Sequence, residues 1–424
     1  MRFILFCIAA FVLPFSSSPA QPLAPRTVAE NVASLIEDNF FDETRAGTIA
    51  AEIRSASASG SWDGISEPLL LASALTEVIA PHDGHFRVTW SRPEGDTGGG
   101  AAGRRLYGFD DRIVRSGYGF RQTGILPGNI GYIDMVFFAH FDFDNPDGPA
   151  WASANAALAL VSATDAVIID LRDNGGGSPA MVGYLISAFT PPDAPIYNIF
   201  HSRSGTESEA PGVFHPAPRL DVPLYILTSA RTASAAEALA YTLQAAGRAT
   251  VVGEASAGGA NPGTTFDAGN GFEVFISTGS PINAITGTNW EGSGVVPDIA
   301  VPSEEALRRG QLAALNAIAE NGDPAFRLDR EWARSALEPV PDIDQDLSTF
   351  VGDYGRAAIT LDETGLLLRQ GRRPVRRLVP VAPGLFRRAA DPLQRYRILS
   401  DETGMVTALE ILRSDGAVSR LRRD

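Results

Sequence analysis

The sequence predicts an α/β fold, with a helical region before the α/β core and a small all-β domain after it. Two stretches carry the α/β prediction, because in each an apolar strand passes through a turn of small residues into an apolar helix. They are DAVIIDL-RDNGGGSP-AMVGYLISAF, residues 165–189, and VPLYILT-SARTAS-AAEALAYTLQA, residues 222–245. Strands that run directly into helices in this way are typical of the α/β class.

The N-terminus, MRFILFCIAAFVLPFSSSPAQP, predicts a signal peptide over residues 1–20, cleaved after Ala20. Its apolar run is too short to serve as a membrane anchor, so we expect an exported protein, periplasmic or secreted. Cys7 is the single cysteine of the chain. The mature chain would then contain no thiol, which excludes disulfides, a cysteine nucleophile and cysteine-ligated zinc.

Residues 21–90 form the predicted helical region. VAENVASLIEDNF and EPLLLASALTEVIA carry apolar residues three and four positions apart, and this region leads into a strand, FRVTW, directly after His85. Residues 91–125 are expected to form a glycine-rich linker followed by short strands. Residues 126–325 are assigned to the core, which includes a Pro- and Ser-rich surface insertion between Thr190 and Leu220.

Residues 340–424 predict a small separate β domain of the barrel or sandwich type. Short alternating strands are separated by turns there, and the turn sequence DETG occurs twice. The arginines of this domain could recognise carboxylates or phosphates. A solvated strand face is the interpretation that we favour for them.

The composition excludes several functions. The chain has 424 residues, 44% of them hydrophobic, and a net charge of −15, which argues against nucleic acid or an anionic membrane as a partner. It contains no lysine, so it has no P-loop. Gly175, Gly177 and Ala180 fit the dinucleotide pattern G-x-G-x-x-A. Three residues separate the strand from these glycines, however, and no acidic residue ends a second strand about 20 positions later, so we disfavour that interpretation.

Ser234 is the first candidate catalytic residue. It lies on a strand-to-helix turn, where backbone N–H groups and the positive end of the helix dipole surround the hydroxyl. An acyl-transfer nucleophile needs this setting. The alternative is that Thr232 or Ser234 only caps the helix.

Four motifs, GNIGYIDMVFF, DAVIIDLRDNGGG, TASAAE and VVGEASAGG, together resemble the family of C-terminal processing proteases, tail-specific proteases and the tricorn protease core. The resemblance covers roughly residues 129–302, and more weakly residues 82–90. It implies a core of stacked ββα units, as in ClpP and crotonase. It also implies a serine peptidase with Ser234 as nucleophile and the N–H groups of Gly176 and Ala235 as oxyanion hole. The glycines expected to contact substrate are Gly175, Gly177, Gly258 and Gly259.

The activating base separates the branches of this family. Processing proteases use a lysine in a G-K-G turn, whereas this chain has Gly258-Gly259-Ala260 there and no lysine anywhere. Arginine cannot act as a neutral base at working pH, which excludes a Ser–Lys mechanism. The tricorn-like branch uses histidine. The resemblance of APHDGHFRVTW to its DGH motif implies that His85 is the base, with His82 as the nearest rival.

The remaining histidines are weaker candidates for the base. His140 lies beside a strand end, and His201 and His215 lie in the Pro- and Ser-rich insertion. Gly84 occupies the position at which the tricorn-like branch has a helper serine, so the orientation of the His85 ring is left open.

The orienting carboxylate is implied by NWEGSGVVPDI, which resembles the branch's glutamate followed by a G-V-x-P-D turn. Glu291 is therefore the expected partner of the imidazole. Glu237 and Glu254 are alternatives, and Glu237 also completes a capping box with Ser234. Fewer than fifty residues separate His85 from Gly131, too few for the PDZ domain that many relatives insert there.

The sequence thus predicts an exported serine peptidase with a Ser-His-Glu acyl-enzyme mechanism, acting on peptides or unfolded proteins. No cofactor, metal, nucleic acid or membrane anchor is implied, and assembly into a homo-oligomer is left open. The alternative is a non-catalytic ligand- or peptide-binding module on the same fold, as in the retinoid-binding repeats that resemble this core.

Overall fold

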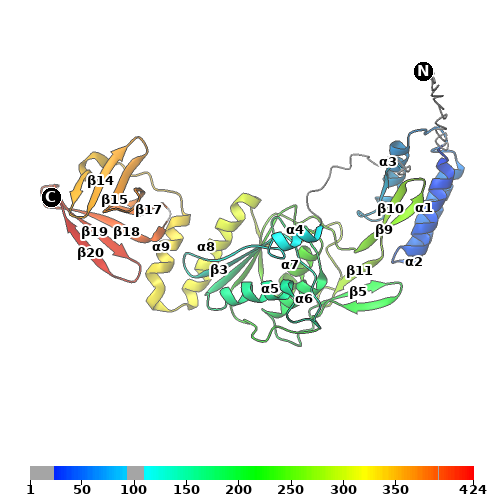
Figure 1. Cartoon of the computed structure of the whole chain (residues 1–424), viewed down its shortest axis with the longest axis horizontal. Coiled ribbons are helices and arrows are strands. Elements are labelled where there is room, and N and C mark those ends of the chain that lie inside the picture. Colours follow the sequence, from blue (N-terminus) through cyan, green and yellow to red (C-terminus); the bar gives the residue numbers. More distant parts are fainter. Residues whose placement is uncertain (1–22, 93–108, 390) are drawn as a thin grey trace, which may run out of the picture. The chain divides into compact units, whose positions relative to one another are not determined.

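A computed structural model describes residues 23–92, 109–389 and 391–424. The predicted signal peptide and most of the glycine-rich linker lie outside these residues. The chain divides into two compact units, the first made of residues 1–96 and 264–276, and the second of residues 97–263 and 277–424 (Figure 1). Each unit is described by itself below.

The first unit begins with three helices that enclose an apolar core. They are α1 (Pro25–Asn39), α2 (Glu43–Ala58) and α3 (Pro68–Ile79). Along α1 the side chains of Val28, Val32 and Ile36 repeat every four residues, so they share one helix face and are fully buried. Asp42 caps α2 by accepting a hydrogen bond from the Arg45 N–H at 3.0 Å.

A three-stranded antiparallel sheet completes the first unit. Its strands, in order, are β1 (Arg87–Trp90), β10 (Phe272–Ser277) and β9 (Gly263–Gly269). Trp90 lies opposite Phe272, and Val88 opposite Val274. From the sequence, residues 264–276 are expected in the core. In the structure they fold with the N-terminal helices instead, because Val274 and Ile276 alternate onto the apolar side of this sheet.

A six-stranded sheet forms the centre of the second unit, in the order β12-β8-β7-β4-β3-β2. The strands are β2 (Phe120–Leu126), β3 (Ile130–Met135), β4 (Ala166–Asp170), β7 (Leu224–Thr228), β8 (Thr250–Gly253) and β12 (Ile299–Ala300). Strands β3, β4, β7, β8 and β12 run parallel, and β2 is antiparallel at the edge. This is the α/β core that the sequence predicts.

Helices cover both faces of this sheet. One face packs against α5 (Pro149–Leu160), α6 (Pro179–Ser187) and α7 (Ala235–Ala245), and the other against α8 (Ser303–Asn321) and α9 (Arg327–Leu337). In β4, Val167 and Ile169 belong to the first of these cores, and Ala166 and Ile168 to the second. Every residue of β4 is therefore buried, as in parallel sheets generally.

Two segments of the second unit have secondary structure that the sequence did not predict. Residues in α4 (Phe109–Arg115) form a helix rather than a short strand, because FDDRIVR lacks strand alternation and ends in Arg112 and Arg115, which favour a helix C-terminus. The predicted surface insertion contains a hairpin, β5 (Asn198–Ser202) and β6 (Gly205–Ser208), which pairs with β11 (Gly279–Asn283).

The C-terminal part is an antiparallel meander of eight strands, β13 to β20, coloured orange to red in Figure 1. They are β13 (Gly352–Tyr354), β14 (Ala357–Asp362), β15 (Gly365–Gln370), β16 (Arg376–Ala382), β17 (Leu385–Arg388), β18 (Asp391–Ser400), β19 (Val406–Arg413) and β20 (Val418–Arg422). The Asp424 N–H donates to Asp353 O at 3.0 Å, so the two ends of the meander meet. The domain is all-β, as predicted, and has its own apolar core.

Two short 3-10 helices precede this domain, η1 (Pro324–Phe326) and η2 (Leu347–Phe350). Among the described residues, no helix combines the length and the apolar character that crossing a bilayer requires.

Candidate active site

Ser234 lies at the junction between β7 and α7, immediately before the first residue of the helix. Its side chain is exposed, and its backbone has φ 55° and ψ −123°. A positive φ is strained for a residue with a Cβ, and such strain concentrates at functional sites. Thr232, the other possible cap, is fully buried and donates from its hydroxyl to Leu171 O at 2.8 Å. This hydrogen bond holds the turn against Leu171, the residue that directly follows β4.

The glycine loop after β4 lies directly against this turn. Gly176 has φ +111°, and a Cβ placed on it would come within 2.7 Å of Ser234 Cβ and 3.2 Å of Ala235 N. Only glycine fits at such a distance. The loop and the turn are also joined by a hydrogen bond of 3.1 Å from the Ala233 N–H to Asn174 O.

The two predicted oxyanion-hole donors differ in their surroundings. Ala235 is the first residue of α7, so its N–H has no acceptor inside the helix. The Gly176 N–H donates to the side-chain oxygen of buried Asn174 at 2.9 Å. Binding of an oxyanion by Gly176 thus requires the substrate oxygen to replace Asn174 Oδ1 as acceptor.

The other predicted substrate-contacting glycines lie at the same loops. Gly175 and Gly177 are exposed, and a Cβ on Gly177 would come within 2.2 Å of Phe138 O. Gly258 has φ +82°, and its carbonyl accepts from the Gly292 N–H at 2.9 Å. Gly259 directly follows it.

Glu237, fully buried in the first turn of α7, accepts four hydrogen bonds. Its Oε2 accepts from the Ser234 N–H at 2.7 Å and from the Gly259 N–H at 2.9 Å. Its Oε1 accepts from the Gly258 N–H and from the Ser256 hydroxyl, both at 2.6 Å. A buried carboxylate with this many donors is satisfied without a cation. Glu237 therefore connects the nucleophile turn to the loop at residues 256–259.

Glu291 holds the next two amides of the same loop. Its Oε2 accepts from the Ala260 N–H at 2.7 Å and from the Asn261 N–H at 3.1 Å. Four consecutive backbone amides, residues 258–261, are thus bound by two glutamates. Glu254, the third candidate carboxylate, accepts instead from the Ser303 N–H at 3.1 Å, at the start of α8.

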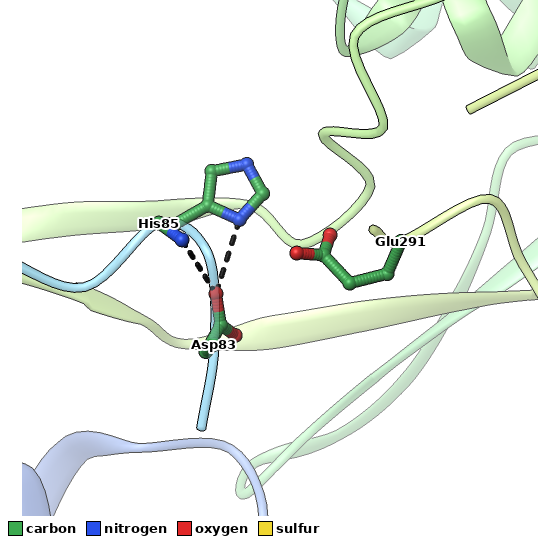
Figure 2. A group of neighbouring side chains, drawn as sticks. All are labelled: Asp83, His85 and Glu291. Carbon is green, nitrogen blue, oxygen red and sulfur yellow. Dashed lines mark hydrogen bonds and ion pairs between the residues drawn. The ribbon is translucent and has the colours of Figure 1, made fainter. Parts of the chain in front are cut away.

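His85 belongs to the first unit, in the turn before β1. Asp83 Oδ1 accepts from the His85 N–H at 2.9 Å and lies 3.1 Å from His85 Nδ1, and Figure 2 shows both bonds meeting at that oxygen. A carboxylate only accepts, so Nδ1 carries the proton and Nε2 of the neutral ring carries the lone pair. The Asp83 side chain is 1% exposed and that of His85 is 27% exposed.

Asp83 was not among the predicted site residues. The signal for it was present in the DGH motif, because an aspartate two residues before a histidine can bond both the histidine backbone and its ring. The rival His82 points to a different partner, since its Nε2 lies 2.8 Å from Glu52 Oε2.

The other histidines have local partners. His140 Nδ1 lies 2.9 Å from the hydroxyl of Ser178, which is the N-cap of α6. His201 is exposed in β5. Burial lowers the pKa of His215, whose Nδ1 accepts from the Ala217 N–H at 3.3 Å.

Ion pairs brace the loops around Ser234. Asp173, next to the glycine loop, accepts from Arg231 Nη2 at 2.5 Å and from Arg121 Nη2 at 2.9 Å. The hydrogen bond from Arg231, followed by that from Arg121, holds the pKa of Asp173 below its usual value. Arg121 also binds Asp134 at 2.7 Å, but burial raises the pKa of that carboxyl. These pairs tie the glycine loop to the nucleophile turn and to β2 and β3.

A pocket of about 400 Å³ lies within the second unit. It is bounded by Pro179, which follows the glycine loop by two residues, by Pro262, which follows Asn261, and by the β5–β6 hairpin. Glu209 at the end of the hairpin also borders it. Phe200 and the two prolines provide apolar surface, and hairpin serines and threonine provide polar atoms.

The sequence between β3 and β12 matches a known family. Residues 129–301 match the profile of Peptidase family S41. These residues, called the S41 domain below, are similar to that family. The resemblance inferred from the four motifs is thereby confirmed, and the S41 domain contains Ser234, the glycine loop, Glu237 and Glu291.

Several solved structures are similar to a part of the chain. One is a lipoprotein from Streptococcus agalactiae, with 16% identity over 73% of this chain and 100% of that one, and a TM-score of 0.45. Another is the photosystem II D1 C-terminal processing protease, with 16% identity over 66% and 94% of the two chains and a TM-score of 0.41. The tricorn protease has 15% identity over 70% and 36% and a TM-score of 0.43.

Proposed function

We propose that this protein is an exported serine peptidase in which Ser234 is the nucleophile and His85 the general base. The observation that carries the proposal is the exposed Ser234 hydroxyl on a strained turn, with Gly176 packed against it. The S41 domain supports peptide-bond hydrolysis as the reaction. The apolar N-terminal segment supports export.

In the proposed reaction, Ser234 Oγ attacks the scissile carbonyl carbon while its proton passes to His85 Nε2. The N–H groups of Ala235 and Gly176 stabilise the oxyanion, the latter after exchanging Asn174 Oδ1 for the substrate oxygen. His85 then donates the proton to the leaving amine. Water, deprotonated by the same ring, hydrolyses the acyl-enzyme and frees Ser234.

Two carboxylates are proposed to act on the imidazole. Asp83 holds the Nδ1–H, which is supported by the 3.1 Å distance within the first unit. Glu291 remains the proposed second carboxylate, which stabilises the imidazolium as it forms. Its support is the match of its surrounding motif to the tricorn-like branch.

The proposed substrate is a peptide or an unfolded protein chain. The pocket beside Pro179 and Pro262 would hold a substrate side chain, because Pro179 follows the glycine loop by two residues and Pro262 follows the loop at residues 258–261. Gly175 and Gly177 on one side, and Gly258 and Gly259 on the other, are proposed to lie along the substrate backbone.

Labelling with a fluorophosphonate probe tests the proposal. The wild-type protein should become covalently labelled, and the Ser234→Ala variant should not. The Ser153→Ala variant is the matched control, because Ser153 lies on α5 and its hydroxyl donates to Pro149 O, so labelling should be unchanged. A folded wild-type protein that remains unlabelled would favour the non-catalytic binding module.

A further inference from the structure

The C-terminal β domain carries a concentration of positive charge that the peptidase proposal does not use. The whole chain has a net charge of −15, yet residues 366–400 contain one acidic residue, Asp391, and nine arginines. The nine are Arg369, Arg372, Arg373, Arg376, Arg377, Arg387, Arg388, Arg395 and Arg397. Such a local excess in an acidic protein is a direct electrostatic signal for an anionic ligand.

Strand register places two of these arginines on the core-facing side of the sheet. Arg376 in β16 is the cross-strand partner of Leu368 in β15, and Arg388 in β17 is the partner of Leu378 in β16. Residues directly opposite each other on antiparallel strands point to the same face. Leu368 and Leu378 belong to the buried apolar core of the domain. Arg376 and Arg388 therefore face the same side as that core.

These side chains border a pocket at the end of the core. The pocket has a volume of about 100 Å³ and is bordered by Leu368, Gln370, Arg373, Pro374, Arg376 and Arg388. Gln370 follows Leu368 by two residues in β15 and so shares its face. Arg373 lies in the turn between β15 and β16. Three guanidinium groups, one carboxamide and the side chain of Leu368 thus border this small pocket.

The acidic groups of the described chain only partly neutralise this pocket. Arg388 Nη2 pairs with Asp391. Its Nε is buried and has no hydrogen-bond partner among the described residues. Within the same residues, neither Arg373 nor Arg376 forms an ion pair. The pocket therefore keeps positive charge from Arg373 and Arg376 that no acidic side chain of the described residues neutralises.

We propose that this pocket binds a phosphate group, either free or as a phosphate monoester. Three arginines opposed by one aspartate complement a dianion better than a singly charged carboxylate. Guanidinium groups bind phosphate oxygens through paired N–H bonds. A pocket of about 100 Å³ has room for one tetrahedral anion. The proposal is independent of the activity of Ser234.

Calorimetric titration of the full-length protein with inorganic phosphate, at constant ionic strength, tests the site. Saturable binding with one site per chain is expected, and Arg376→Gln should weaken it by about tenfold or more. Arg373→Gln, in the turn, provides a second variant that leaves the strands intact. The matched control is Arg422→Gln, an exposed arginine at the end of β20, which should bind phosphate like the wild type.

Three results would overturn the proposal. They are a heat signal that does not saturate, equal binding by the Arg376→Gln and Arg422→Gln variants, and acetate binding as tightly as phosphate. Two further arms distinguish the source of the phosphate. Glycerol 3-phosphate tests a soluble ester, and co-sedimentation with phosphatidic acid vesicles, compared with phosphatidylcholine vesicles, tests a lipid headgroup. In the arm that gives binding, Arg376→Gln should weaken it by about tenfold or more.

Discussion

The backbone N–H of Ser234 donates a hydrogen bond to Glu237 Oε2 at 2.7 Å, and the same carboxylate binds the amides of Gly258 and Gly259. The position of the nucleophile is therefore coupled to a loop more than twenty residues further along the chain. Glu237 acts as a positioning residue, since its oxygens are directed at backbone N–H groups and the Ser256 hydroxyl.

Glu237→Gln should reduce kcat by about ten- to a hundredfold, because one carboxamide NH₂ would face backbone N–H donors and displace the turn that carries Ser234. The free energy of unfolding should fall by about 2–4 kcal/mol. Peptidase kinetics and urea unfolding measure the two effects. Glu254→Gln, which alters a single amide contact away from the turn, is the control and should retain kcat. Equal kcat values for both variants would contradict the positioning role.

Gly176→Ala should abolish fluorophosphonate labelling, because its Cβ would come within 2.7 Å of Ser234 Cβ and its φ of +111° strains any other residue. Gly124→Ala, in β2, is the control. A Cβ on Gly124 meets nothing within 4 Å, so labelling should persist. Mass spectrometry of the labelled protein reads both results, and efficient labelling of the Gly176→Ala variant would argue against close packing of this loop on the nucleophile.

Asp83→Asn should lower kcat by roughly 10²- to 10⁴-fold, because the amide no longer enforces the Nδ1–H tautomer of His85. Glu52→Gln removes the equivalent partner of His82 and should leave kcat unchanged. Steady-state kinetics of the Asp83→Asn and Glu291→Gln variants, measured side by side, show how much each of the two proposed carboxylates contributes to kcat. If Glu291→Gln alone abolished activity, Asp83 would be reduced to a structural role in the turn.

Glu209 should make the protein less stable as the pH rises from about 4.5 to 8. Burial raises the pKa of this carboxyl to about 8. A hydrogen bond from Asn198 Nδ2 to Glu209 Oε2, at 2.6 Å, acts in the opposite direction. Glu209 Oε1 is buried without a hydrogen-bond partner among the described residues. The folded state therefore keeps a proton on Glu209 that the unfolded state loses near the ordinary pKa of a glutamate. The contribution of Glu209 to the free energy of unfolding is complete below the pKa of the unfolded state and disappears as the pH rises to the pKa of the folded state.

Glu209→Gln removes this titration. The variant should lose the decrease that Glu209 causes between pH 5 and 8, and at pH 8 it should be about 1–3 kcal/mol more stable than the wild type. Urea unfolding at both pH values measures the difference, with the exposed Glu207→Gln as control. A wild-type stability that rises over this pH range would refute the prediction.

Local sequence was sufficient for the parts of the site that depend on one strand-to-helix junction. The positions of Ser234 and of the glycine loop at their turns were predictable, because the turn chemistry and the neighbouring apolar periodicity lie within a few residues of each other, and their catalytic roles stay predictions. The role of Glu237 was not. Its capping-box position is visible in TASAAE, but its bonds to Gly258 and Gly259 depend on how β8 returns beside α7.

The S41 domain, the α/β core and the C-terminal β domain were predictable for the same reason, since each follows from short patterns. Long-range pairing was not. Nothing local marks Phe272 as the partner of Trp90, because a strand pattern shows that a strand exists and says little about which strand it joins. Asp83 was not predicted although it is two residues from His85, because its double contact with the backbone N–H and the ring of His85 depends on the conformation of the turn.

The pairing of β1 with β10 has a practical consequence for dissecting the protein. An expression fragment that starts after residue 108 would delete β1 and the three N-terminal helices while retaining the β9–β10 hairpin. Val274 and Ile276 would then be exposed to water on a strand with open hydrogen-bonding groups, which is a template for aggregation. Insolubility of such a fragment would result from the β9–β10 hairpin without its partner strand β1, and would not show that the S41 domain is unable to fold.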